Sequence, residues 1–346
     1  MFEELLEKEG FWSKVGPFSD VVLSSRVRLA RNISNIYFPS HQSENDVGIV
    51  RSLAKKFANE STYNGSIYIL NLNDINRDDK RFLRERNIIT YKMELLNNRL
   101  IIVENNEKFS IMINEEDHFR IQIIKPGFQL MEAYQLADRV DDELNRFVSY
   151  AYSEKFGYLT SSPINCGTGL RLSVTLHLPI LSILKIMPDV IKVTKENGAM
   201  IGGIIGEGIK SIGSIFQLSN HMTIYRTEVD VIEEIDQMTS IIVEMESEAR
   251  DEYLSENEHQ LMDIIWRSYG ILKYSRNMGY AEAMNHLSNF RLGIILSIIK
   301  DVDLNRINDI MINIQWSHLE KIAAQKFEDS LECDYFRSFY LRMQLD

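Results

Sequence analysis

Residues 161–179 read SSPINCGTGLRLSVTLHLP and join a glycine turn to a strand. Gly167 and Gly169 can adopt backbone angles that other residues avoid, so a turn is predicted here. From residue 170 to 178 apolar and polar residues alternate, which is the period of a half-buried strand. Arg171 therefore lies where the turn meets the strand, a good position from which to present a cation to a ligand.

The rest of the first half carries similar strand patterns and one long helix. Residues 128–147 follow Pro126-Gly127 and have apolar residues at helical spacing, which predicts an amphipathic helix. The strands do not alternate regularly with helices, so the sequence predicts an α+β fold with a mainly antiparallel sheet flanked by helices. Strands are expected at residues 19–32, 66–70, 110–114, 120–124 and 170–178.

From Thr227 onward the pattern is helical. The segment TEVD (227–230) resembles a capping box with Asp in place of Glu, and apolar residues follow it at helical spacing. We therefore expect two domains, residues 1–228 with the sheet and residues 229–346 entirely helical. Further helices are expected around residues 257–275, 280–299 and 303–325.

Composition indicates a soluble globular protein of 346 residues, 45% of them hydrophobic. The formal net charge of −12 argues against general nucleic-acid binding, which needs a basic surface. Two cysteines cannot build a disulfide framework, and the first residues, MFEELLEKEG, lack the order of a signal peptide. The apolar runs are too short to span a bilayer, so we expect a cytoplasmic protein that binds neither membrane nor nucleic acid directly.

Two motifs combine charges in a way that suits a phosphorylated ligand. In SSRVRLARN (24–32) a strand places Arg26 and Arg28 on one face, where their guanidinium groups can bind a polyanion. In NEEDHFR (114–120) extended geometry places Glu116 on the same face as Arg120. Taken alone, a solvated edge strand explains the first motif better, and a polar loop explains the second.

A glycine-rich segment, AMIGGIIGEGIKSIG (199–213), contains Glu207 as its only acid. It fits either a loop that closely approaches a ligand or a turn with Glu207 facing water. Together, the arginines and two isolated carboxylates match what phosphoryl transfer to a cationic acceptor requires, namely positioning and charge neutralisation.

The order and spacing of SSRVRLARN, NEEDHFRIQ and PINCGTGLRLSVTLHLP resemble the phosphagen (guanido) kinase family, most closely its bacterial members that phosphorylate arginine side chains in proteins. The segments YGILKYSR (269–276) and EAMNHLSNFRLGI (282–294) resemble the helical C-terminal domain of those members. The resemblance covers nearly the whole chain. It implies ATP and Mg²⁺ as cofactors, with Glu116 and Glu207 clamping the guanidinium of the substrate. It also implies that the ATP phosphates are bound by Ser24, Arg26, Arg28, Arg120, Arg171 and Ser173.

The resemblance further implies partners and a second binding site. The expected partners are protein substrates with exposed arginines, a zinc-containing activator protein and a Clp-type chaperone or protease, and a homodimer is expected through the helical domain. A phosphoarginine-binding site is expected at Asp334 and Arg337, in the segment CDYFRS.

Four positions depart from the family pattern. Ser162 stands where the family has a reactive cysteine, Gly202 where it has a phosphate-binding arginine, and Asn87 where a histidine borders the adenine. Cys333 replaces the first arginine of the phosphoarginine motif. These departures keep open a pseudokinase that binds nucleotide or phosphoarginine without transferring phosphate. A kinase of free guanidino compounds is a third alternative. Cys166 matches an apolar position of the family, and we expect it to be a small buried residue.

Overall fold

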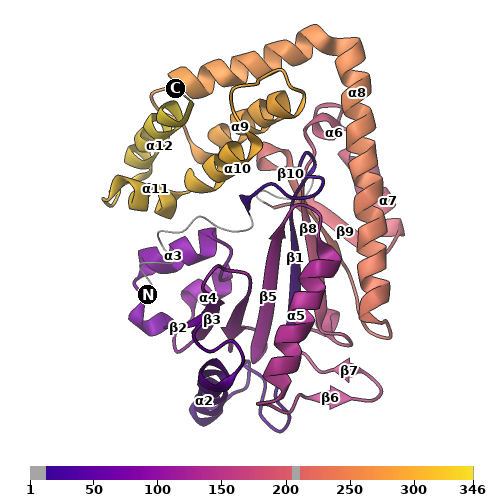
Figure 1. Ribbon diagram of the computed structural model, residues 1–346, viewed down its shortest axis with the longest axis vertical. Coiled ribbons are helices and arrows are strands. Elements are labelled where there is room, and N and C mark those ends of the chain that lie inside the picture. The colour runs from indigo at the N-terminus through magenta and orange to yellow at the C-terminus, as the bar shows by residue number, and fades with distance from the viewer. Residues whose placement is uncertain (1–12, 205–210, 346) are drawn as a thin grey trace. The chain divides into compact units, whose positions relative to one another are not determined.

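The computed structural model describes residues 13–204 and 211–345 (Figure 1). Its main sheet has the strand order β2-β3-β4-β5-β1-β8-β10-β9, and the pairs β1–β5, β2–β3, β3–β4 and β4–β5 are antiparallel. The α+β prediction with a mainly antiparallel sheet is therefore confirmed. The strands are β1 (Val22–Arg31), β2 (Ile67–Asn71), β3 (Leu100–Glu104), β4 (Ser110–Ile113), β5 (Phe119–Pro126), β8 (Leu170–His177), β9 (Ala199–Gly203) and β10 (Ile215–Asn220).

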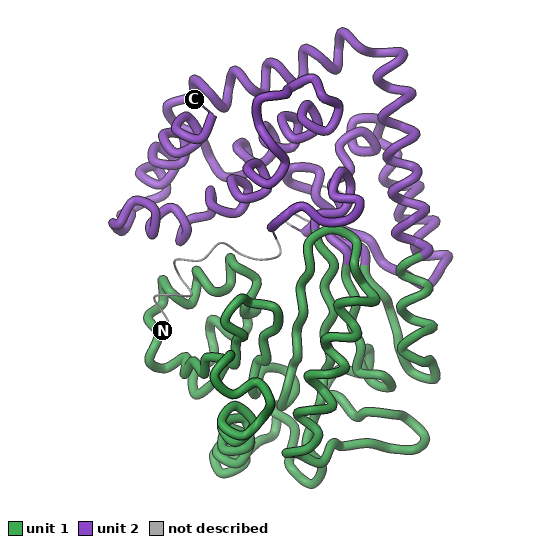
Figure 2. The backbone as a smooth tube through the Cα atoms, viewed as in Figure 1, with its two compact units in different colours: residues 1–12, 24–173, 219–236 green, residues 13–23, 174–218, 237–346 purple. Residues whose placement is uncertain are grey.

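The described chain forms two compact units, coloured separately in Figure 2, and neither is continuous in sequence. Unit 1 contains residues 24–173 and 219–236, and unit 2 contains residues 13–23, 174–218 and the chain from 237 onward. The division at 228/229 stays a prediction, because compact units group residues by contact and not by order along the chain.

In unit 1 the predicted helix over residues 128–147 is α5 (Leu130–Asn145), which packs against β5. Its face toward the sheet carries Leu130, Ala133, Ala137, Val140 and Leu144, all buried. A two-stranded hairpin of β6 (Tyr152–Ser153) and β7 (Gly157–Tyr158) follows and stands clear of the main sheet in Figure 1. The other unit 1 helices are α2 (Glu44–Glu60), α3 (Arg77–Glu85) and α4 (Tyr91–Leu95).

The helix α8 (Glu228–Tyr274) begins with the predicted capping box. The Asp230 amide donates to Thr227 Oγ1 at 3.2 Å and the Thr227 amide donates to Asp230 Oδ2 at 3.0 Å. The helix has one non-helical residue, Asn257, so the helix expected at 257–275 is its second half. No helix of the described residues is long and apolar enough to cross a membrane.

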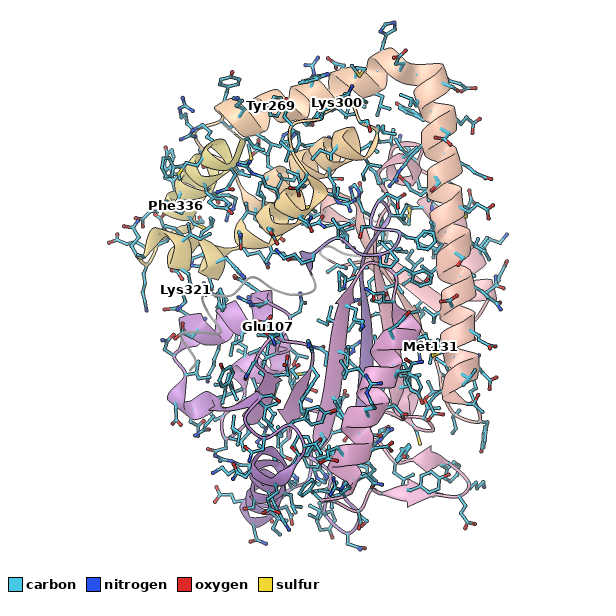
Figure 3. All side chains as sticks on the ribbon, in the orientation of Figure 1. Glu107, Met131, Tyr269, Lys300, Lys321 and Phe336 are labelled. Carbon is cyan, nitrogen blue, oxygen red and sulfur yellow. The ribbon has the colours of Figure 1, made fainter. Side chains whose placement is uncertain are left out.

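Unit 2 is built around the second half of α8 and the helices that follow it. Tyr269 of α8, labelled in Figure 3, stacks on Phe290 of α9 with 5.2 Å between ring centroids. Arg291 of α9 is fully buried, and it donates to Asn308 Oδ1 at 3.2 Å and to His177 at 2.8 Å. The helices are α6 (Pro179–Ile183), α7 (Met187–Glu196), α9 (Tyr280–Ile295), α10 (Leu304–Asn313), α11 (Trp316–Ala323) and α12 (Ser330–Leu345).

Candidate active site

The arginines predicted to bind phosphate share one face of the sheet. On β1, Arg26 lies opposite Ile124 and Arg28 lies opposite Gln122, while Ala30 lies opposite Arg120 of β5. Directly opposed residues of an antiparallel pair point to the same face, so the guanidinium groups of Arg26, Arg28 and Arg120 lie on one side. Val27 and Leu29, between them on β1, are buried on the other side, as the alternation predicted.

Two of these arginines have no carboxylate partner among the described residues. Arg26 donates to Ser173 Oγ at 3.1 Å, and the buried Nε of Arg28 has no hydrogen-bond partner. Burial, assisted by the positive charges of Arg120 and Arg171, lowers the pKa of Arg26 to about 10. Burial and the neighbouring guanidinium groups also hold the pKa of Arg28 well below its usual value. Such uncompensated cations fit the phosphates of a nucleotide, which supply the missing negative charge.

Arg171 enters the same electrostatic cluster from the start of β8. Its guanidinium donates to Asn220 O at 2.5 Å and to Ser219 Oγ at 3.2 Å, both on β10. The preceding turn needs glycine, because a Cβ on Gly169 (φ 70°) would lie 2.6 Å from the Ala30 carbonyl oxygen. The glycine turn before a strand is thus confirmed. It brings Arg171 beside β1, where its charge lowers the pKa of Arg26.

The three consecutive carboxylates have different environments. Glu115 is buried, accepts hydrogen bonds from Arg120 at 2.8 Å and Thr90 Oγ1 at 2.9 Å, and is the counter-ion of Arg120. Burial alone raises the pKa of Glu115, but Arg120 and Thr90 lower it overall. Glu116 is partly exposed, and among the described residues its carboxylate has no hydrogen-bond or ion-pair partner. Glu116 is therefore the carboxylate available to a substrate.

The backbone around these acids turns, and this corrects the expectation of extended geometry. Asn114 has φ 58°, and its amide donates to the His118 carbonyl oxygen at 2.9 Å. Glu116 consequently does not share a strand face with Arg120, and the ion pair of Arg120 is with Glu115. Sequence alone gave no signal for Thr90, which also caps α4 by accepting from the Met93 amide at 3.2 Å.

Asp117 anchors the loop that carries Ser162 next to Glu116. Its buried Oδ1 accepts from Asn32 Nδ2 at 2.6 Å and from the Ser161 amide at 2.7 Å. Ser161 Oγ in turn donates to the Glu116 carbonyl oxygen at 2.7 Å. The loop and the available carboxylate therefore form one hydrogen-bonded group.

His118 has a structural role beside these acids. Its Nδ1 accepts from the Ile33 amide at 2.8 Å, and its Nε2 lies 3.0 Å from the Tyr37 carbonyl oxygen, to which it donates. Both ring nitrogens are therefore occupied in the neutral form. Burial lowers the pKa of His118, so the ring stays neutral at physiological pH and is unsuited to carry a proton during a reaction.

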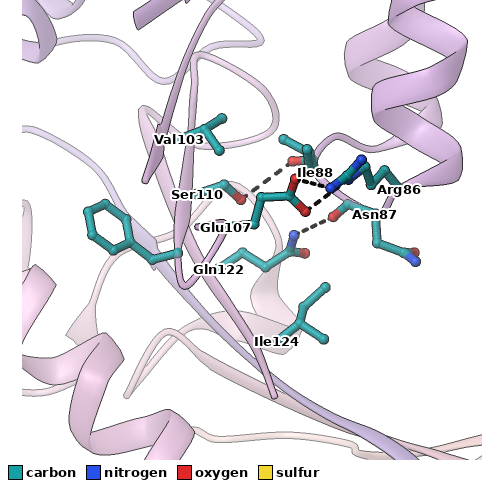
Figure 4. A pocket seen from close by; sticks show the side chains of 9 residues that line it. Arg86, Asn87, Ile88, Val103, Glu107, Ser110, Gln122 and Ile124 are labelled. Atoms are coloured by element: carbon teal, nitrogen blue, oxygen red, sulfur yellow. Dashed lines mark hydrogen bonds and ion pairs between the residues drawn. The ribbon is translucent and has the colours of Figure 1, made fainter. Parts of the chain in front are cut away.

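A cavity of about 20 Å³ lies between the end of α3 and strands β3, β4 and β5 (Figure 4). Its lining includes Gln122 and Ile124, which lie opposite Arg28 and Arg26 on the sheet and therefore belong to the same face. Gln122 Nε2 donates to the Asn87 carbonyl oxygen at 2.6 Å across the cavity, as drawn in Figure 4. The cavity thus continues the face that carries the cationic cluster.

Comparisons with known proteins agree with this geometry. Residues 48–249 match the family model of the ATP:guanido phosphotransferase C-terminal catalytic domain, and residues 258–346 match the protein-arginine kinase McsB C-terminal domain. The chain is 38% identical over 337 residues to a protein-arginine kinase of Bacillus pumilus, covering 96% of this chain and 93% of the relative. The chain belongs to the protein-arginine kinase family of ATP:guanido phosphotransferases. The protein-arginine kinase of Bacillus subtilis is 37% identical over the same share of both chains.

Solved structures of guanido kinases share the fold. The duplicated taurocyamine kinase of Schistosoma mansoni with bound transition-state analog components aligns with a TM-score of 0.62 and 22% identity, over 76% of this chain and 38% of that one. The chain therefore spans less than half the length of that kinase. A lombricine kinase aligns with a TM-score of 0.59 and 20% identity, over 71% and 70% of the two chains. These similarities support the phosphagen-kinase fold and nothing finer.

The other predicted site residues lie in several places within this family member. Ser24 and Ser173 are buried, and Ser162 is partly exposed in the loop beside Glu116. Glu207 lies outside the described residues. Gly202 is in β9, and nothing lies within 4 Å of the position where its Cβ would be.

In unit 2, Arg337 is buried and already has several partners. It donates to Asp334, to the carbonyl oxygens of Ile314 and Met278 at 2.9 Å each, and to Cys333 Sγ at 3.2 Å. The phosphoarginine site at Asp334 and Arg337 stays a prediction.

The expectation for Cys166 was wrong about burial. Cys166 is partly exposed, and its Sγ lies 3.6 Å from the Phe156 carbonyl oxygen. It directly follows the short 3₁₀ turn Pro163–Asn165, so its side chain lies at the edge of a surface loop and not in the core.

Proposed function

We propose that this chain transfers the γ-phosphoryl group of ATP to arginine side chains of proteins. The observation that carries the proposal is a complementarity of unpaired charges in unit 1. Among the described residues, Arg26 and Arg28 have no carboxylate partner and Glu116 has no cationic partner. A polyphosphate satisfies the first need and a guanidinium satisfies the second. The relatives named protein-arginine kinase support a protein-bound arginine as the acceptor.

In this proposal the cationic cluster binds the phosphates of ATP. Arg26, Arg28, Arg120 and Arg171 provide the charge, and Ser24 and Ser173 line the same strands. Magnesium bound to ATP supplies further positive charge at the phosphate oxygens. Arg120 is held at its position by Glu115, which keeps one guanidinium fixed before the nucleotide arrives. The adenine is proposed to lie near Asn87, because the family has a histidine beside the adenine at this position.

Glu116 acts on the acceptor. It orients the guanidinium and accepts a proton from the attacking Nη, because a protonated guanidinium is a poor nucleophile. As the Nη–P bond forms, the bond from the γ-phosphorus to the leaving oxygen of ADP breaks. Glu207 is proposed as the second carboxylate of this clamp.

The proposal is tested by incubating the protein with Mg-ATP and an arginine-rich protein and detecting acid-labile phosphoarginine by mass spectrometry. Glu116→Gln is expected to lower turnover by roughly 10²- to 10⁴-fold, the usual contribution of a general base, while ATP affinity is retained. The proposal is contradicted if the wild type yields no phosphoarginine, with or without an activator, and the Glu116→Gln variant gives the same result.

Gly202 favours a second candidate, a pseudokinase that binds nucleotide without transfer. The family arginine at this position is missing, and nothing lies within 4 Å of the place where a Cβ at residue 202 would be, so Gly202→Arg has room to begin its side chain. If the chain is a weak kinase, Gly202→Arg is expected to raise turnover by up to roughly 10²- to 10³-fold. Enzymes lose about this factor when one hydrogen-bond donor to the transition state is removed, so restoring such a donor should regain it. If ATP binds but neither protein yields product, the pseudokinase is the better description.

We propose a cytoplasmic homodimer in which residues 1–228 carry catalysis and residues 229–346 form the contact between copies. Its proposed partners are a zinc-containing activator and Clp-type degradation machinery. Support for the dimer comes from α12, where the exposed side chains between residues 331 and 345 are all apolar and recur every four residues. They are Leu331, Tyr335, Phe339 and Met343.

A further inference from the structure

Three surface segments of unit 1 are pressed together beside the candidate site: the β6–β7 hairpin, the turn at 163–167 and the loop at 221–226. Gly157 has φ 73°, and a Cβ there would lie 2.4 Å from the Gly167 carbonyl oxygen. Gly167 has φ 112°, and its Cβ would lie 2.6 Å from the Thr223 carbonyl oxygen. Because backbone touches backbone at both contacts, the three segments form one fixed scaffold.

Hydrogen bonds hold the same segments in place. The amide of Tyr158 donates to the Gly167 carbonyl oxygen at 2.8 Å, and the amide of Gly167 donates back to Tyr158 at 3.2 Å. Thr223 Oγ1 donates to the Cys166 carbonyl oxygen at 3.0 Å. A surface held in this way loses little conformational freedom when a ligand binds.

The exposed side chains of this scaffold include the polar Glu154, Lys155 and His221, but five others are large and apolar. They are Tyr152, Phe156, Ile164, Met222 and Tyr225, exposed by 61, 39, 43, 45 and 74%; we call them the aromatic platform. Tyr152 also packs edge-on against Tyr158, with 5.4 Å between ring centroids. Single exposed apolar residues are ordinary, but a set on one rigid scaffold is typical of an interaction surface, and tyrosine is enriched in such contacts.

The platform is joined to the available carboxylate. Ser161 is hydrogen-bonded to the Glu116 carbonyl oxygen and to Asp117, and Ile164 follows three residues later. Three residues span at most about 10 Å of chain. Ile164, one edge of the platform, is therefore within reach of the residues that flank an arginine bound at Glu116.

We propose that the aromatic platform docks apolar residues that flank the target arginine in a protein substrate. This inference rests on the proposed function and names the substrate class: extended protein segments in which aromatic or aliphatic residues adjoin an arginine. A free guanidino compound has no flanking residues and gains nothing from the platform. The loop that carries Ile164 of the platform is hydrogen-bonded beside Glu116, which favours a substrate segment over other occupants. Only a substrate must contact Glu116 and the platform at the same time.

The test uses two peptides of equal length and charge, one with Leu and Phe beside its arginine and one with Ser and Gln. For the wild type, KM for the apolar-flanked peptide is expected to be roughly 10-fold lower, which corresponds to about 1.4 kcal/mol from a few docked side chains. Tyr152→Ser with Tyr225→Ser is expected to remove that difference and leave kcat and the KM for ATP unchanged. Tyr225→Ser alone, at the most exposed position, repeats the measurement with the least risk to folding.

Tyr274→Ser is the matched control, because Tyr274 is 70% exposed but lies in unit 2. It is expected to leave both KM values unchanged. Equal KM values for the two peptides in the wild type would overturn the proposal. So would a platform variant in which KM rises by the same factor for both peptides.

Peptide affinity separates this proposal from the proposed function. The Glu116→Gln variant, which does not turn peptide over, is titrated with both fluorescent peptides with and without the platform substitutions. Tighter binding of the apolar-flanked peptide that disappears in the platform variant supports docking even if no phosphoarginine forms. Unchanged affinity, together with dissociation of an oligomer in size-exclusion chromatography, would make the platform a contact between copies and overturn the proposal.

Discussion

Arg28 and Arg31 lie three residues apart on β1, on opposite faces of the sheet, and their environments are opposite in kind. Arg31 is 3% exposed and has a complete set of partners. Its guanidinium lies 2.7 Å from Asp141, donates to the Thr168 carbonyl oxygen at 2.9 Å and lies 3.6 Å from the centre of the Tyr158 ring. The buried Nε of Arg28 has no partner among the described residues.

The two arginines differ in whether a neighbouring carboxylate compensates their charge. Burial by itself lowers the pKa of Arg31, but Asp141 raises it overall, whereas the pKa of Arg28 falls well below its usual value. A compensated charge fastens α5 to β1, because Asp141 belongs to that helix. An uncompensated charge costs folding free energy until an anion binds. The compensated charge on one face therefore stabilises the fold, and the uncompensated charge on the other is the one that the proposed nucleotide would neutralise.

The largest expected effect comes from breaking the compensated side. Arg31→Ala leaves Asp141 buried without its partner, and we expect the free energy of unfolding to fall by about 3–5 kcal/mol, as for other broken buried pairs. Urea denaturation of the folded protein measures it. Arg31→Ala combined with Asp141→Ala is expected to cost less than the two single losses added together. Strict additivity of the two losses would show that the pair is not coupled.

Arg28→Met is expected to give the reverse result. Removing an unpaired buried charge should leave the free energy of unfolding unchanged or higher. Affinity for ATP should fall by roughly 10- to 100-fold, because hydrogen bonds between charged groups contribute about 1.5–3 kcal/mol each. Isothermal titration with ATP and urea denaturation of the same sample measure both quantities. A large loss of stability with intact ATP affinity would show that Arg28 stabilises the fold and does not bind ATP.

The smallest effect is a pH dependence of nucleotide binding. The pKa of Arg26 is lowered to about 10 in the free protein, and a bound phosphate favours the charged form. The contribution of Arg26 to ATP affinity is therefore fully present below that pH and is expected to decline as pH rises through about 10. Arg31 has a raised pKa and stays charged over the same range. Arg26→Met should remove this part of the decline, and a decline that persists in Arg26→Met would assign it to another group.

Much of the fold followed from local patterns. Alternation predicted β8 and the two faces of β1, helical spacing predicted α5, and the capping box at Thr227 and Asp230 predicted the start of α8. The strand β3 was missed, because all five of its residues are buried and a strand covered on both faces shows no alternation. The interleaving of the two compact units has no signal in the sequence, since no local pattern reports which distant segments contact one another.

The candidate site was predictable in composition but not in arrangement. The sequence placed Arg26 and Arg28 on one face correctly, because strand alternation is a local property. It placed Glu116 and Arg120 on one face of an extended strand, which is wrong, because Asn114 adopts a left-handed conformation and turns the chain. Only the fold brings Thr90 to Glu115 and thereby assigns Glu115 to Arg120. Glu116 is left available as a result.

By itself, then, the sequence determined which residue types the chain offers, which of them alternate along a strand, and which family motifs they compose. The tertiary structure decided which charges are neutralised. That decision depends on partners far apart in sequence, such as Asp141 for Arg31, and on their absence around Arg28. Two arginines of the same strand look alike in sequence, because the electrostatic energy of a buried charge depends on what surrounds it in space.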